Sequence, residues 1–167
     1  MKDIHSKEHR FETDYAAYSQ KVFRLCLGYV GNACEAEDLL QEIFVKVWQN
    51  YDHFRGDSQV GTWIYRIAVN TCLCKLRSAK RSQMQTIKDT IEDTSAHYSE
   101  KEQQTQLLYK CIEQLPDTER LIITMVLEEM SYPEIAKITE ITEANLRVKI
   151  HRIKQKLTEL YNRYEKF

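Results

Sequence analysis

Glycine and proline are scarce in this sequence, with four glycines and two prolines among 167 residues. Hairpins and phosphate-binding loops depend on these residues at their turns, so we do not expect a β-sandwich, a barrel or a Gly-rich nucleotide-binding fold. Long apolar runs are also missing: the longest, around residues 121–127, is too short for a transmembrane helix. The first ten residues lack the apolar segment of a secretory signal, and we therefore expect a cytoplasmic protein.

The cysteines and histidines do not have the spacing of a metal site. The five cysteines stand at positions 26, 34, 72, 74 and 111, with no CxxC pair, and the five histidines are scattered. In a cytosolic protein such cysteines are expected to be reduced, helical and buried. Cys72 and Cys74 should point to different faces of one helix. We expect neither a metal nor any other cofactor.

Acidic and basic residues cluster in separate segments, although the formal net charge is only −1. Residues 66–81 contain five bases and no acid, residues 143–156 contain five bases and one acid, and residues 34–42 contain four acids and no base. The overall balance argues against a nucleic-acid-binding protein, whereas these segments suggest local contacts with charged partners. Solvated helix faces would give the same pattern, so no single segment decides between the two interpretations.

Apolar residues recur at helical spacing in two blocks, which predicts an all-α protein. In the first block we expect helices over residues 13–31, 33–49 and 59–79, with a loop at 52–61. Gly28 should weaken the first helix, and Gly31 should end it. The second helix should bury a broad stripe consisting of Leu39, Leu40, Ile43, Phe44, Val47 and Trp48.

A polar linker is predicted over residues 82–104, where few apolar residues occur. Its length indicates two small helical domains, at 12–81 and 105–163, that can move independently. In the second domain we expect helices over 105–115, 118–129, 132–138 and 143–161.

The last two predicted helices have the dimensions of a helix-turn-helix. Ser131 and Glu134 form a capping-box signature at the start of the first, and Thr142 should cap the second. Glu140 stands in the turn, where glycine would be easier.

The final helix has an apolar side and a polar side. The predicted apolar stripe consists of Leu146, Ile150, Ile153, Leu157, Leu160 and Tyr164. His151 and Arg152 lie on the opposite face with Arg147 at its flank, so their donors could reach base edges and phosphates in a major groove. An ordinary surface helix rich in Lys and Arg would show the same pattern.

The third predicted helix and the loop before it combine aromatic, basic and amide side chains. That combination suits single-stranded nucleic acid, since aromatic rings stack on bases and amides read their edges. Trp63 has the spacing of a core residue, whereas Asn70 is unfavourable in the middle of a helix and so is a better candidate for function.

Three segments, in this order, resemble bacterial sigma factors of the extracytoplasmic-function (ECF) group. Residues 36–48, AEDLLQEIFVKVW, are similar to the helix by which the family binds core RNA polymerase. Residues 54–58, 62–70 and 75–77 resemble its promoter-melting and −10-reading part. Residues 115–116, 132–136 and 145–152 resemble its −35-reading helix-turn-helix.

The resemblance implies site residues and partners. Polymerase contacts are implied for Asp38, Leu39, Gln41 and Glu42. Contacts to −10 DNA are implied for Phe54, Arg55, Ser58, Arg66, Asn70, Lys75, Arg77 and Arg81, with a flipped base held by loop 54–59 beside Asn70. Contacts to −35 DNA are implied for Thr142, Asn145, Arg147, Lys149, His151 and Arg152. The implied partners are core RNA polymerase, promoter DNA (duplex −35 and single-stranded −10 elements) and an anti-sigma factor, without membrane insertion or a small-molecule substrate.

Two other functions stay open at this point. A helix-turn-helix regulator would bind duplex DNA without polymerase, but it would leave the acidic segment and the aromatic–basic helix without a purpose. An all-α enzyme would need a nucleophile–base set, a metal-ligand spacing or a phosphate loop, and we find none of these patterns in the sequence. The chain also departs from the family pattern at Cys74, Glu140 and Asn145, where Asp, Gly and Thr or Ser are usual.

Overall fold

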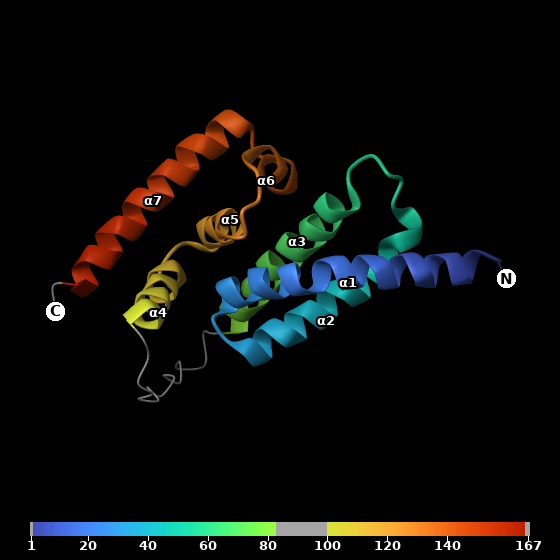
Figure 1. The fold of residues 1–167 in the computed structure, drawn as a ribbon, viewed down its shortest axis with the longest axis horizontal. Coiled ribbons are helices and arrows are strands. Elements are labelled where there is room, and N and C mark those ends of the chain that lie inside the picture. The colour runs from blue at the N-terminus through green and yellow to red at the C-terminus, as the bar shows by residue number, and fades with distance from the viewer. Residues whose placement is uncertain (1, 83–99, 166–167) are drawn as a thin grey trace.

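The computed structural model describes the backbone of residues 2–82 and 100–165, and the side chains of residues 6–75 and 103–164. These ranges contain helices and no strand, which confirms the all-α prediction (Figure 1). The elements are α1 (Lys2–Val30), α2 (Ala33–Asn50), a 3-10 turn η1 (Tyr51–His53), α3 (Val60–Ser82), α4 (Glu100–Glu113), α5 (Asp117–Leu127), α6 (Tyr132–Thr139) and α7 (Glu143–Glu165).

Helices α1, α2 and α3 form the first half of the molecule and share one apolar core. Figure 1 shows α1 and α2 running side by side. The predicted stripe of α2 faces this core, with Leu39, Ile43, Phe44 and Val47 buried and the two flanking residues of the stripe partly buried. The neighbouring helices contribute Val22, Leu25, Cys26, Tyr29, Ile64, Ala68 and Cys72.

Helix α1 is longer than predicted, because it begins at Lys2 and not near residue 13. Its added turns are held by aromatic contacts: the Phe11 ring lies 5.1 Å from Trp48 and 6.2 Å from Tyr51, both edge-on. The Lys7 ammonium lies 4.5 Å from the centre of the Trp48 ring. The Tyr51 hydroxyl donates to Asp14. The N-terminal turns of α1 therefore pack against both η1 and the end of α2.

The junction between α1 and α2 lies at Gly31, where the first helix was predicted to end. Gly31 adopts a φ of 73° and donates its N–H to the Leu27 carbonyl at 2.8 Å, which ends α1. Asn32 then caps α2 by accepting the Glu35 N–H at 3.2 Å.

Helices α4 to α7 form the second half. Helix α4 begins at Glu100, five residues before the predicted start, so part of the predicted linker is helical; the remainder, residues 83–99, lies outside the described residues. The capping box is confirmed, with the Ser131 amide and hydroxyl donating to Glu134 at 2.9 and 2.6 Å. Thr142 accepts the Asn145 N–H at 3.4 Å, and Glu140 has the left-handed φ of 57° expected in the turn.

The structure also tests the expectations about the cysteines, Tyr164 and membrane-spanning helices. Cys34 and Cys74 are exposed, against our expectation that all five cysteines are buried, while Cys72 and Cys74 do lie on different faces. Tyr164 is exposed and not part of the apolar stripe; its hydroxyl accepts from the Gln114 amide at 2.6 Å. Among the described helices, none has the length and apolar character needed to cross a membrane.

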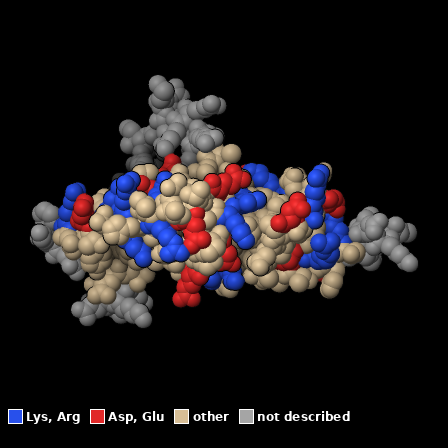
Figure 2. All heavy atoms as spheres, turned by 90° about the horizontal axis from the view of Figure 1, so that it is seen from above, with Lys and Arg blue, Asp and Glu red and all other residues tan. Residues whose placement is uncertain are grey.

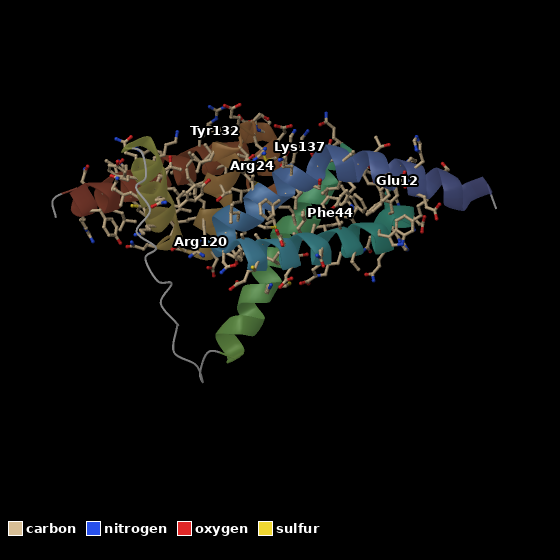
Figure 3. The ribbon with its side chains drawn as sticks, turned by 60° about the horizontal axis from the view of Figure 1, so that its bottom comes forward. Glu12, Arg24, Phe44, Arg120, Tyr132 and Lys137 are labelled. Atoms are coloured by element: carbon tan, nitrogen blue, oxygen red, sulfur yellow. The ribbon has the colours of Figure 1, made fainter. Side chains whose placement is uncertain are left out.

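The two halves are packed together in this structure, while their ability to move independently stays a prediction. Helix α5 lies against α1, and α6 lies against α3. Arg24 forms a 2.6 Å ion pair with Glu128 across this contact, and Arg120 donates to the Tyr29 carbonyl at 2.8 Å. Figure 3 shows Arg24, Arg120 and Lys137 where the two halves meet. Side chains of one half pair with backbone of the other, and binary patterning does not reveal such contacts.

The capping box generates a testable prediction. Hydrogen bonds from the hydroxyl and then the amide of Ser131 hold the pKa of Glu134 below its ordinary value. We expect Ser131→Ala to lower the unfolding free energy by about 1 kcal/mol at neutral pH. A lowered carboxyl pKa stabilises the fold above the pKa of the unfolded chain, and this contribution is lost as pH falls through the folded value. Urea unfolding should therefore show a smaller Ser131→Ala cost at about pH 3 than at pH 7; an equal cost would contradict the assignment.

Candidate nucleic-acid interface

An acidic stripe runs along the exposed side of α2. Asp38 is exposed, and the exposed Gln41 and Glu42 follow it by three and four residues, about one helical turn, so the three lie on the same side of the helix. Val45 continues that face and is 53% exposed, which makes it an apolar patch among polar groups. We call these four residues the acidic α2 face. Leu39 is not part of it, because its side chain is fully buried in the core.

The acidic α2 face is bordered by one cation. Lys46 forms a 2.7 Å ion pair with Glu42 and also donates to the Thr71 hydroxyl at 3.4 Å. This pairing fixes one edge of the face against α3. Sequence reasoning missed Val45, although its place seven residues after Asp38 puts it on the same helical face.

A chain of aromatic rings connects α1 with the loop before α3. Trp63 lies 5.9 Å from Tyr51 and 4.9 Å from Phe54, between ring centres. Burial, and then the hydrogen bond to Asp14, raises the pKa of Tyr51 to about 12, so its hydroxyl stays protonated and keeps donating. Trp63 is only partly buried, and therefore serves both the core and the surface.

Beside these rings lies an open hollow of about 370 Å³ between α2, η1 and α3. Asn70 is exposed and lines it together with Asn50, His53 and Trp63. We call this the Asn70 hollow. Its amides and imidazole can donate and accept hydrogen bonds, and its indole offers a ring face. Sequence reasoning found Asn70 but missed Asn50 and His53, which stand just before the aromatic–basic segment.

We expected the loop at 54–59 to form one pocket with Asn70, but the structure does not show this. Ser58, Asp57 and Gln59 line a separate hollow, opposite Glu134 and Lys137 of the second half. Gly56 turns the loop with a φ of 77°. Arg55 is exposed beside it. The structure thus separates Ser58 from Asn70.

The basic residues of α3 differ in how far they are available. Arg66 is engaged, since its Nε and Nη2 donate to the Lys137 carbonyl at 3.0 and 2.8 Å. Lys75 is partly buried and has an interaction partner. Arg77 and Arg81 lie on the described α3 backbone, but their side chains are outside the described residues.

Helix α7 presents a polar face away from the core. Leu146, Ile150, Ile153 and Leu157 are buried, and Leu160 is partly buried. The candidate residues Thr142, Asn145, Arg147, His151 and Arg152 are exposed, and Lys149 is partly buried. This confirms that the helix has the two sides predicted from its spacing.

Arg147 is the one candidate on α7 that the structure shows with two partners. Its guanidinium forms a 2.5 Å ion pair with Glu143 and lies 5.6 Å from the centre of the Tyr132 ring of α6. Asn145, His151 and Arg152 are the candidates on the open face of α7.

Figure 2 shows acidic and basic side chains interspersed over one face of the molecule. On that face they do not separate into one acidic and one basic side. Binding to a charged partner therefore depends on the local helix faces described above more than on the net charge of −1.

Comparison with known families gives matches in both halves. Residues 15–82 match the profile of sigma-70 region 2, and residues 105–157 match that of sigma-70 region 4. The chain is 34% identical over 152 residues to the ECF RNA polymerase sigma-E factor of Escherichia coli K12, covering 83% of this chain and 79% of that protein. It is 30% identical over 156 residues to the ECF RNA polymerase sigma factor SigW of Bacillus subtilis, covering 84% and 82%.

Solved structures share the fold. A chain in the co-crystal structure of the sigma factor RpoE with the anti-sigma factor NepR from Bartonella quintana matches with a TM-score of 0.75 and 20% identity, over 92% of this chain and 97% of that chain. A chain in the structure of CnrH with the cytosolic domain of CnrY matches with a TM-score of 0.69 and 19% identity, over 93% and 89%.

The burial of Leu39 gives a prediction that separates packing from surface binding. Leu39→Ala should lower the unfolding free energy by about 2–5 kcal/mol, because it leaves a cavity between packed helices. Asp38→Ala, one residue earlier and exposed, should change it by no more than about 0.5 kcal/mol. Chemical denaturation of both variants measures this contrast, and a mild effect of Leu39→Ala would place that side chain outside the core.

Proposed function

This chain belongs to the ECF group of RNA polymerase sigma factors, and from that premise we propose which of its surfaces perform each part of the group's work. As a member of the group it directs RNA polymerase to promoters for transcription initiation, and it is not an enzyme. The proposal assigns polymerase docking to the acidic α2 face, −10 reading to the Asn70 hollow and −35 reading to the open face of α7.

The acidic α2 face suits docking onto a basic surface of core polymerase. Asp38 and Glu42 supply charge that steers association, and exposed Val45 supplies the apolar centre that a desolvated interface needs. Leu39 supports this face indirectly, because its buried side chain fixes α2 on the core. The single observation that carries this assignment is the exposed apolar side chain within an acidic stripe.

The Asn70 hollow suits an unstacked base of the non-template strand. Stacking of a base on an aromatic ring is worth about 1–3 kcal/mol, and Trp63 offers such a ring in the hollow. Asn50 and Asn70 carry amides that can read a base edge, and His53 adds a further donor and acceptor. Phe54 extends the aromatic surface towards Arg55, which is exposed and able to bind a phosphate.

The open face of α7 suits the major groove of the −35 element. His151, Arg152 and Asn145 present donors that can reach base edges, while Lys149 and Thr142 suit the backbone. Arg147 is paired with Glu143, so we assign it to a phosphate that can replace that carboxylate.

An anti-sigma factor is the regulatory partner that we propose. The RpoE chain with the same fold was solved in complex with an anti-sigma factor. Polymerase and promoter DNA are the partners of initiation, and the cytoplasm is the compartment in which all of them would meet.

Reversing the charge of the acidic α2 face tests the docking assignment. Asp38→Lys together with Glu42→Lys should weaken binding to core polymerase by at least about tenfold, because cations would face the basic dock. The matched control is Glu8→Lys with Glu12→Lys, which makes the same charge change on exposed positions of α1. Fluorescence titration with core polymerase measures affinity, and circular dichroism verifies folding. Equal affinity of the two double variants would contradict the assignment.

Truncating Arg152 tests the −35 assignment. Arg152→Ala should cost about 1–3 kcal/mol of holoenzyme binding to a duplex −35 element and should relax preference at one base pair. Arg163→Ala is the control, since Arg163 is exposed in the last turn of the same helix. Promoters mapped by run-off transcription supply the probes. A uniform loss across sequences, with a lower salt dependence, would make Arg152 a phosphate contact instead of a base reader.

A further inference from the structure

Helix α7 exposes an apolar side chain in the middle of its open face. Val148 is 51% exposed, whereas Leu146 and Ile150, two residues to either side, are buried in the core. Among the described residues of α7, the other exposed large apolar side chain is that of Tyr164, whose hydroxyl accepts a hydrogen bond from Gln114. The side chain of Val148 has no polar atom, so it cannot form such a contact.

Folding of α7 does not require a valine at position 148. A β-branched residue is less favourable than alanine inside a helix, because it loses side-chain freedom against the preceding turn. Single exposed apolar residues are common on protein surfaces, so exposure alone does not indicate a binding site. What distinguishes Val148 is its place among groups that suit DNA.

Hydrogen-bonding side chains surround Val148 on the surface of the helix. Helix α7 packs against α4, α5 and α6, and Figure 1 shows it at the edge of the molecule. On its open face, Asn145 and His151 lie three residues from Val148, and Arg152 lies four residues from it. These spacings place all three side chains within about 60° of Val148 around the helix axis.

The charge around Val148 is positive. Residues 142–152 contain three cations and one acid, Glu143. That acid is already paired with Arg147 at 2.5 Å, so it does not oppose the approach of a phosphate to the rest of the face. An apolar group within a cationic helix face suits duplex DNA, because the cations bind phosphates while the apolar group meets a base.

The major groove contains one apolar group that a valine can recognise, the 5-methyl group of thymine. Guanine, adenine and cytosine present nitrogen and oxygen atoms at the corresponding edge, and a valine placed against these atoms would exclude water from them without replacing its hydrogen bonds. Against a thymine, the valine would instead remove two apolar surfaces from water. The chemistry of Val148 therefore favours a base pair whose thymine faces α7.

The helical rise places Val148 between two proposed readers of the −35 element. Val148 lies about 4.5 Å along the axis after Asn145 and about 6 Å before Arg152, and each distance is roughly one to two base-pair steps. Ala144, one turn before Val148, is exposed and small, so the backbone of α7 can approach the bases closely on this side. Val148 also lies in the second turn of α7, and recognition helices contact base edges with their N-terminal residues.

We propose that Val148 is a specificity-determining residue of the −35 surface, and that its methyl groups contact the 5-methyl group of a thymine among the base pairs that Asn145 and Arg152 address. This step rests on the proposed function, which places the open face of α7 in the major groove of the −35 element. The contact adds apolar recognition to the hydrogen bonds already assigned there. The promoters of this protein should accordingly carry a thymine at that position, on one strand or the other.

Removing the methyl group from the DNA tests this contact directly. Deoxyuridine keeps the hydrogen-bonding atoms of thymidine and lacks only the 5-methyl group. In a fluorescein-labelled promoter fragment mapped by run-off transcription, each thymine of the −35 element is replaced in turn, and anisotropy measures binding of the reconstituted holoenzyme. One replacement should weaken binding roughly fourfold, which corresponds to the burial of one methyl group.

Val148→Ala should abolish this dependence on the methyl group. The variant holoenzyme should bind the thymine and deoxyuridine fragments equally, and about as weakly as the wild type binds the deoxyuridine fragment. The Tm of the variant, measured by circular dichroism, should be no lower than that of the wild type, because alanine is the better helix former. A purely structural role for Val148 would give a lower Tm and an unchanged preference for thymine.

Thr158→Ala is the matched control. It makes the same kind of change, from a β-branched residue to alanine, at another exposed position of α7 about 15 Å further along the axis. Its preference for the thymine fragment should equal that of the wild type. A loss of that preference in Thr158→Ala as well would attribute it to the helix as a whole and overturn the assignment to Val148.

Two further results would overturn the proposal. If no deoxyuridine replacement weakens wild-type binding, the −35 surface reads no thymine methyl group. If a replacement weakens the wild type and Val148→Ala equally, another side chain or the DNA itself is responsible. The proposed function fails separately: if Arg152→Ala binds as the wild type does, the open face of α7 is not the reading surface, whereas a loss with Arg152→Ala and none with deoxyuridine overturns only the role of Val148.

Discussion

The burial of α1 on two sides is the constraint on which the rest of the structure depends. Its Val22, Leu25, Cys26 and Tyr29 are almost fully buried, and it contacts α2, α3, α4, α5 and η1. Near its start, Phe11 supports the aromatic rings beside the Asn70 hollow. Near its end, the bare backbone of Gly28 receives α5. One helix therefore positions the Asn70 hollow, which we propose for −10 reading, and also sets how the two halves meet.

On the helices with proposed binding surfaces, one face packs on the core and the opposite face is exposed, so residues adjacent in sequence have different roles. On α2, Asp38 is exposed while Leu39, the next residue, is fully buried. On α7, Ile150 is buried and His151 is exposed. A step of one residue turns the side chain by about 100°, so a motif that is contiguous in sequence splits into packing and binding residues in space. A resemblance to a family assigns a role to the motif as a whole. The burial of each side chain then shows which residues pack in the core and which are available for binding.

Local signals predicted most of the fold. The starts of α6 and α7 agree with the caps predicted at Ser131 and Thr142, because a cap involves only residues within one turn. The features of the fold that were not predicted depend on contacts between residues that are distant in sequence. The early start of α1 rests on Phe11 meeting Trp48, and the packed halves rest on Arg66 meeting a backbone carbonyl. Only part of the Asn70 hollow was predicted from the sequence. Asn70 stood out because asparagine is unfavourable in the middle of a helix, whereas nothing in the sequence singled out Asn50.

Arg66 shows how a residue assigned to DNA can also hold two parts of the fold together. Its partner in the structure is the neutral Lys137 carbonyl, whereas its proposed partner on DNA is a charged phosphate. The planar guanidinium fits two phosphate oxygens at once, and a phosphate adds the attraction of opposite charges that a carbonyl lacks. A carboxylate in place of that carbonyl would compete with phosphate far better, so the neutral acceptor leaves the guanidinium able to exchange to DNA.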